Sequence, residues 1–97
     1  IMKYNRNDEE LAHMPSKVKT AFLKLQSLDA PVKIWHDTNP NSQNYRGYFW
    51  LSGEEGKDEW LDYYSNFWGS EKLNDILNKA GLYWEWENTA WGNVYDL

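Results

Sequence analysis

Cysteine is absent from the 97-residue chain. This absence excludes a disulfide framework, a thiolate nucleophile and cysteine-ligated metal sites, and it is typical of a protein from a reducing compartment. Long apolar runs are missing too, since none approaches the roughly 20 residues of a membrane-spanning helix. Residues 3–10 are polar, whereas a secretory leader would carry an apolar core there. We therefore expect a cytoplasmic protein with no membrane partner.

Motifs of catalysis and cofactor binding are also missing. The sequence has no nucleophile elbow, Walker loop or dinucleotide-binding fingerprint. Its two histidines, His13 and His36, have no companions at the spacing of a metal site or a catalytic triad. Glu85 and Glu87 would share one strand face about 7 Å apart, but the neighbouring tryptophans would project to the opposite face, so these acids would lack the apolar walls of a catalytic carboxyl group. We expect no enzyme, no catalytic residue, no cofactor and no metal site.

Negative charge is concentrated in one half of the chain. Residues 1–46 carry seven Lys/Arg and five Asp/Glu, whereas residues 47–97 carry three and ten, so the net charge of −5 is the sum of +2 and −7. An acidic chain repels phosphate backbones, which disfavours nucleic acid as a partner. An acidic surface attracts a basic protein surface, although acidic residues also serve solubility alone.

Aromatic residues are abundant, with seven tryptophans, seven tyrosines and three phenylalanines. A chain of this length is expected to form one domain over residues 1–97, with residues 1–7 loosely ordered. It would bury roughly 11,000 Å² on folding, of which the aromatic side chains need only about 3,400 Å². Area therefore forces no ring to the surface, and an exposed aromatic surface has to be inferred from the sequence pattern.

Two regions have the apolar spacing of amphipathic helices. Apolar residues recur at helical intervals after a proline, which predicts a helix over residues 15–28. A second helical pattern runs over residues 57–68 and breaks at Gly69. Ser70 then suits the N-cap of a continuing helix, and Gly81 suits its left-handed stop.

Strand patterns fill the rest of the chain. Residues 32–36, 45–52, 82–87 and 91–95 have strand composition, and the last two segments suit a hairpin. The predicted fold class is α+β, with a four-stranded, mainly antiparallel sheet and helices packed on one face.

The two faces of this predicted sheet differ in chemistry, because side chains alternate between them. The set expected under the helices is apolar: Val32, Ile34, Phe49, Leu51, Leu82, Trp84, Trp86 and Val94. The opposite set mixes aromatic and charged residues: Lys33, Trp35, Arg46, Tyr48, Trp50, Tyr83, Glu85, Glu87, Asn93 and Tyr95. Such a mixture is typical of an interface, so we predict a partner-binding surface at Trp35, Tyr48, Trp50 and Tyr83. The alternative is that these rings pair across strands and stabilise the sheet.

A second candidate surface is acidic. Five carboxylates fall within nine residues: Glu54, Glu55, Asp58, Glu59 and Asp62. Their spacing does not follow an EF-hand calcium loop. At a helix start they could engage a basic groove of a partner, or they could simply favour the helix dipole.

These features favour a small acidic intracellular protein-binding domain, an inhibitor or an adaptor. In its sharpest version the protein is an inhibitor whose carboxylates mimic the phosphates of nucleic acid. The alternative is a carbohydrate- or small-ligand-binding module with Trp35 and Trp50 as a stacking platform. Single-stranded nucleic acid could use the same rings with Lys33 and Arg46, but the net charge opposes it. Nothing in the sequence specifies an oligomeric state.

Overall fold

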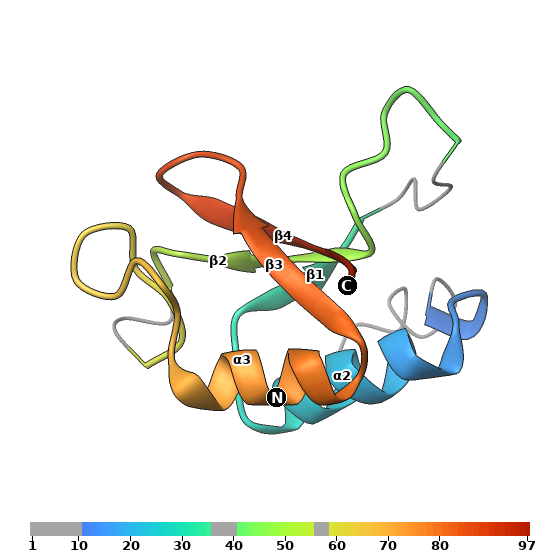
Figure 1. The fold of residues 1–97 in the computed structure, drawn as a ribbon, viewed down its shortest axis with the longest axis horizontal. Coiled ribbons are helices and arrows are strands. Elements are labelled where there is room, and N and C mark those ends of the chain that lie inside the picture. Colours follow the sequence, from blue (N-terminus) through green and yellow to red (C-terminus); the bar gives the residue numbers. More distant parts are fainter. Residues whose placement is uncertain (1–10, 36–40, 56–58) are drawn as a thin grey trace.

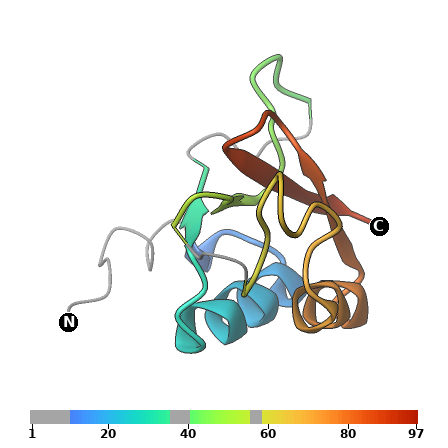
Figure 2. The same cartoon turned by 90° about the vertical axis from the view of Figure 1, so that its left-hand side faces the viewer.

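The computed structural model describes residues 11–35, 41–55 and 59–97. Its elements follow in the order α2 (Ser16–Ser27), β1 (Val32–Ile34), β2 (Phe49–Ser52), α3 (Glu71–Lys79), β3 (Leu82–Trp86) and β4 (Trp91–Asp96). The strands form one layer and the helices a second layer beneath it (Figure 1). Turned by 90°, the same view shows the two helices side by side under the sheet (Figure 2). The predicted α+β fold class is confirmed.

The sheet has the strand order β1-β2-β4-β3, and every neighbouring pair is antiparallel. β3 and β4 form the predicted hairpin. The chain passes from β2 through α3 to the edge strand β3, and β4 then returns between them. Lys33, Trp50, Asn93 and Glu85 are successive partners across the four strands, so they lie in one row on one face.

Local signals account for both helices. Pro15 precedes α2, whose buried stripe is Val18, Ala21, Phe22 and Leu25. The side chain of Ser70 accepts the backbone N–H of Leu73 and so caps α3. Gly81 follows α3 with a φ of 75°, the left-handed stop expected there.

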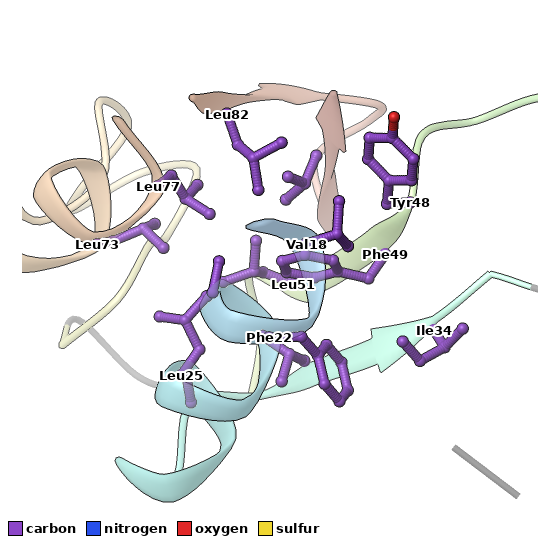
Figure 3. Packing of buried hydrophobic residues seen from close by; sticks show 14 of the residues in the cluster. Val18, Phe22, Leu25, Ile34, Tyr48, Phe49, Leu51, Leu73, Leu77 and Leu82 are labelled. Atoms are coloured by element: carbon purple, nitrogen blue, oxygen red, sulfur yellow. The ribbon is translucent and has the colours of Figure 1, made fainter. Parts of the chain in front are cut away.

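The core lies between the helices and the inner face of the sheet. Phe22 of α2 meets Phe49 of β2 edge-to-face, with ring centroids 5.2 Å apart. Leu73 and Leu77 of α3 close the core below Leu82 (Figure 3). Six of the residues predicted for the inner face are buried, as expected: Val32, Ile34, Phe49, Leu51, Leu82 and Val94. Full burial of each large apolar side chain contributes about 1.5–3 kcal/mol.

The predicted helix over residues 57–68 is wrong for the residues described, which begin again at Glu59. Residues 59–69 form turns with one isolated bridge, between Asp62 and Asn66. Asp62 accepts the backbone N–H groups of Tyr64 and Ser65. Short polar side chains that bond nearby backbone groups in this way compete with helix formation.

Three strands are shorter than predicted, β3 by a single residue because it ends at Trp86. β1 ends at Ile34, and His36 lies outside the described residues. β2 begins at Phe49 rather than at residue 45. Gly47 has a φ of 94°, which interrupts the extended backbone before Tyr48. In the described parts of the chain, no helix is long and apolar enough to span a membrane.

Candidate functional site

The outer face of the sheet, opposite the helices, carries an aromatic layer. Its members are Trp35, Tyr45, Trp50, Tyr83, Trp91 and Tyr95, all half-buried. The Trp50 ring centroid lies 5.9 Å from those of Trp35 and Trp91, and that of Tyr83 lies 5.8 Å from that of Tyr95. Three predicted site residues, Trp35, Trp50 and Tyr83, therefore lie on this face, where they contact other rings of the same layer.

The centre of this outer aromatic layer is a polar contact. Asn93 is 0% exposed. Its side-chain oxygen accepts the indole N–H of Trp35 at 2.9 Å, and its amide donates to the Glu87 carboxylate at 2.8 Å. The indole N–H of Trp91 is buried and has no hydrogen-bond partner in the described part of the chain. A buried, satisfied amide fixes the rings above it.

Cations cover part of the same layer. The Lys33 ammonium lies 5.7 Å from the Trp50 ring centroid, and the Arg46 guanidinium lies 5.8 Å from that of Trp35. Such contacts are attractive at this range. Much of the ring surface of the outer aromatic layer is therefore in contact with other groups of the fold. This agrees with the alternative that these rings pair across strands and stabilise the sheet.

Tyr48 is not on the outer face, contrary to the prediction. Its side chain is 6% exposed and belongs to the core cluster (Figure 3). Because Gly47 interrupts the strand, the alternation of faces does not extend back to residue 48. The Tyr48 hydroxyl donates to Asp96 at 2.7 Å. Burial, followed by this hydrogen bond, raises the pKa of Tyr48 to about 12.

The acidic residues do not form a helix start. Glu54 and Glu55 are exposed in the turn after β2, and Asp58 lies outside the described residues. Glu59 is exposed and pairs with Lys72 of α3 at 3.5 Å. Asp62 caps its own loop, and the backbone N–H groups of Ser65 and Tyr64 lower its pKa. Among the acidic residues of this cluster that the structure describes, Glu54 and Glu55 are exposed, and their carboxylates make no ion pair or hydrogen bond with another described residue.

The most exposed rings of the described chain lie in the aromatic loop, defined as residues 62–69. Tyr64 is 86% exposed and Trp68 is 81% exposed, and Phe67, which lies between them in the sequence, is 36% exposed. The loop lies at the side of the sheet, yellow in Figure 1. Tryptophan and tyrosine are enriched among the residues that dominate binding energy at protein interfaces, so a short loop that exposes one of each is a candidate interface.

Hydrogen bonds define the conformation of this aromatic loop. Asp62 and Asn66 exchange both backbone hydrogen bonds, at 3.2 and 2.9 Å. The indole N–H of Trp86 donates to the Phe67 carbonyl at 2.8 Å, and the Asn74 amide donates to the Trp68 carbonyl at 3.0 Å. The loop is thus tied to β3 and to α3, so its exposed rings are presented from a specified backbone.

Trp84 and Trp86 lie beneath the loop rather than wholly under the helices, and both are half-buried. Trp86 packs against Phe67 and against Gly53, where a Cβ would lie 2.9 Å from the indole. Trp84 lies close to Gly69 and Gly92 in the same way. The glycines let the indole rings approach the backbone.

A cavity of about 510 Å³ opens between the aromatic loop and β3. We call it the loop pocket. Its lining residues are Phe67, Trp68, Asn74, Trp84, Glu85 and Trp86. Of these six residues, the sequence analysis predicted Glu85 on the outer face and Trp84 and Trp86 on the inner face. It placed none of the six in the binding site. The polar residues Asp62, Ser65 and Asn66 between the aromatics were the one sequence signal for a loop instead of a helix.

Comparison with known proteins gives no match: no family model matches the chain, and neither does any curated protein or solved structure. Among the described residues, no three His, Asp or Glu side chains are grouped so that they could hold a metal ion.

Proposed function

We propose that this chain is a small protein-binding domain that docks on its partner through the aromatic loop. The observation that supports it most directly is the exposure of Trp68 (81%) and Tyr64 (86%) on a hydrogen-bonded loop. Tryptophan and tyrosine are the residues most enriched among those that dominate binding energy at protein interfaces.

The aromatic loop has more free energy to gain on binding than the outer aromatic layer. Burial of a tryptophan removes roughly 200 Å² from water, which corresponds to about 5 kcal/mol at 25 cal/mol/Å² before the costs of association. Trp68 retains most of that surface in the free protein. Trp35 and Trp50 are already half-buried against neighbouring rings, so they have less to gain.

The hydrogen bonds to the loop backbone also favour binding, because they order the loop in the free protein. Ordering a loop on binding costs free energy for every side chain and backbone segment that becomes fixed. Here Asp62 fixes the first turn and Asn74 fixes the Trp68 carbonyl before any partner arrives. The exposed carboxylates of Glu54 and Glu55, with the net charge of −5, favour a partner with a basic surface.

The test is affinity capture with the tagged protein from nuclease-treated lysate of the source cells. The captured protein is then identified, purified and titrated against the chain by calorimetry. We expect the double variant Tyr64→Ala/Trp68→Ala to bind at least about thirtyfold more weakly than the wild type, the loss typical of an interface anchor. Both residues are exposed, so the variant should retain the thermal stability of the wild type.

The matched control is Leu23→Ala. Leu23 is an exposed apolar residue of α2, away from the aromatic loop, and its removal should leave the affinity unchanged. A partner that binds the double variant as tightly as the wild type would contradict the proposal. If no protein is captured and glycans quench the tryptophan fluorescence instead, the chain is a carbohydrate-binding module, the alternative function that aromatic platforms also support.

A further inference from the structure

β3 lies at one edge of the sheet, because the strand order is β1-β2-β4-β3. Figure 1 shows it as the front strand of the sheet. An edge strand has one side on which no neighbouring strand bonds its backbone N–H and C=O groups. These groups are a template for a further strand, so proteins commonly protect an edge with proline, lysine, a bulge or a covering segment.

The alternation of hydrogen bonds shows which backbone groups of β3 point to this free edge. The Glu87 N–H donates to the Trp91 carbonyl at 2.9 Å, and the Leu97 N–H donates to the Gly81 carbonyl at 2.9 Å. Hydrogen-bonded pairs of an antiparallel ladder recur at every second residue, so the odd-numbered residues of β3 bond to β4. The even-numbered residues therefore direct their backbone groups to the free edge: Leu82, Trp84 and Trp86.

The free edge of β3 is not covered in the described part of the chain. No described residue makes a hydrogen bond to the outward backbone groups of Leu82, Trp84 or Trp86. The loop pocket is lined by Trp84, Glu85 and Trp86 in succession. Because consecutive side chains of a strand point to opposite faces, a cavity that touches all three residues reaches the strand backbone.

The opposite edge of the sheet, at β1, is protected. β1 has three residues, with Pro31 before it and Lys33 at its centre. Its Val32 N–H donates to the Ala30 carbonyl at 2.8 Å, so this donor is already used. β3 has five residues, a continuous register with β4, and neither proline nor lysine. A regular and largely aromatic edge of this kind is suited to pair with another strand.

We propose that β3 pairs with β3 of a second copy of this chain, so that two four-stranded sheets join into one sheet of eight strands. The inference goes beyond the proposed function, because it concerns association of the chain with itself. Trp84 is the middle residue of β3, and its backbone groups point to the free edge. A two-fold axis beside Trp84 therefore makes the edge complementary to itself. Each outward residue then exchanges two hydrogen bonds with the residue opposite.

This two-fold register also brings compatible side chains together. On the inner face, Leu82 lies opposite Trp86 of the partner subunit, and both are apolar. On the outer face, Tyr83 lies opposite Glu85 of the partner subunit, in the kind of pair whose side chains are closest. Glu85 is the one charged residue of β3, so no like charges lie directly opposite each other in the paired strands. Leu82 of the partner subunit adds an apolar wall to the loop pocket beside Trp86.

The first experiment is sedimentation velocity of the purified full chain from low micromolar to millimolar concentration. We expect a monomer–dimer equilibrium with a dissociation constant on the order of 10–100 μM, as for a small interface. Amide hydrogen exchange at both ends of this range locates the contact. The N–H groups of Leu82, Trp84 and Trp86 should gain protection in the dimer, whereas those of Tyr83 and Glu85 bond to β4 and should be protected throughout. A chain that stays monomeric, or a dimer that leaves the even-numbered amides unprotected, would overturn the inference.

Opposite charges at position 83 test the register. In the dimer, Tyr83→Lys places an ammonium opposite Glu85 of the partner subunit, and Tyr83→Glu places a carboxylate there. Both variants lose the same ring contact with Tyr95, so they are matched as monomers. We expect Tyr83→Glu to dimerise at least about tenfold more weakly than Tyr83→Lys, because like charges directly opposite each other are destabilising. The double variant Tyr83→Glu/Glu85→Lys restores a pair of opposite charges and should dimerise as Tyr83→Lys does.

The control makes the same two substitutions at Tyr95, which lies on β4, one strand inward from the edge. Tyr95→Lys and Tyr95→Glu should dimerise within about threefold of each other. Equal dimerisation of Tyr83→Lys and Tyr83→Glu would overturn the inference.

The proposed function has a separate outcome. Tyr83→Glu leaves Tyr64 and Trp68 intact, so this variant should lose self-association and still bind the captured partner. If the wild type is monomeric at every concentration while Tyr64→Ala/Trp68→Ala abolishes partner binding, the docking loop stands and the pairing of β3 is rejected.

Discussion

The Tyr48 hydroxyl donates a hydrogen bond of 2.7 Å to one oxygen of Asp96, which joins the segment before β2 to the end of β4. The ammonium of Lys17, at the start of α2, lies 2.7 Å from the other oxygen. One carboxylate thus connects the helix layer with two parts of the sheet layer. Lys17, followed by Tyr48, lowers the pKa of Asp96.

The stabilisation that Asp96 provides should be lost in acid. Since its pKa is lower in the folded chain than in the unfolded chain, its contribution is present above about pH 4 and is lost as the pH falls through the folded pKa. Urea unfolding between pH 7 and pH 2 should therefore show a smaller loss of free energy for Asp96→Asn than for the wild type. The control Asp75→Asn removes an exposed pair with Lys79. A wild-type slope in Asp96→Asn would contradict this prediction.

Tyr48 should limit stability in alkali. Its pKa is raised to about 12, so its contribution is present below about pH 10 and is lost as the pH rises through the folded pKa. Tyr48→Phe should lower the free energy of unfolding by about 1.5 kcal/mol at pH 7, because a hydrogen bond to a charged acceptor is lost. The same variant should show a flatter decline above pH 10 when urea unfolding is followed by circular dichroism. A decline as steep as that of the wild type would assign the alkaline loss to other groups.

Gly47 and Gly81 form a matched pair for backbone strain, since their φ values are 94° and 75°. A Cβ on Gly47 would lie 2.3 Å from the Val94 carbonyl oxygen, whereas on Gly81 the nearest atom would be 3.9 Å away. Gly81→Ala should therefore cost only about 1 kcal/mol for the left-handed backbone, and Gly47→Ala about 3 kcal/mol or more. Thermal unfolding of both variants measures the difference, and equal costs would show that the contact at Gly47 relaxes freely.

Removal of the buried amide should loosen the outer aromatic layer. Asn93→Ala leaves the Trp35 indole N–H without its acceptor and takes a donor from Glu87. We expect a loss of about 2–4 kcal/mol in urea unfolding, from the cavity and the unsatisfied donor together. The near-ultraviolet circular dichroism of the tryptophans should weaken in parallel. Asn78→Ala, an exposed position of α3, is the control and should stay within about 0.5 kcal/mol of the wild type.

Asp62 should determine the order of the aromatic loop. Asp62→Ala removes the acceptor of the Tyr64 and Ser65 backbone N–H groups. Amide hydrogen exchange should accelerate at these two positions and leave the core of α2 at its wild-type rate. Asp62→Asn keeps a side-chain oxygen and should restore much of the protection. Unchanged exchange in Asp62→Ala would mean that the ties to β3 and α3 suffice to order the loop.

Local patterns in the sequence determined much of the fold. The apolar spacing from Val18 to Leu25 and the Ser70 cap identify α2 and α3, because such signals act within one or two turns of the chain. Alternation identifies the hairpin and six residues of the inner face. The helix predicted from Lys57 is wrong over the described residues 59–68, where Trp60 and Leu61 are both buried although they are neighbours in the sequence. The apolar residues of this segment have the spacing of a helix, but the hydrogen bonds that Asp62 accepts from the Tyr64 and Ser65 backbone favour a turn.

Tertiary structure decided which rings are available to a partner. Trp35 and Trp68 are equally apolar in the sequence, yet Trp35 packs on the Trp50 ring of a neighbouring strand, whereas Trp68 extends from a loop that hydrogen bonds tie to β3 and α3. Tyr48 turned inward because the Gly47 backbone lies against Val94, a residue far along the chain. Local sequence specifies backbone preferences within a few residues, whereas exposure depends on which distant segments pack above a side chain, and that contact exists only in the folded chain.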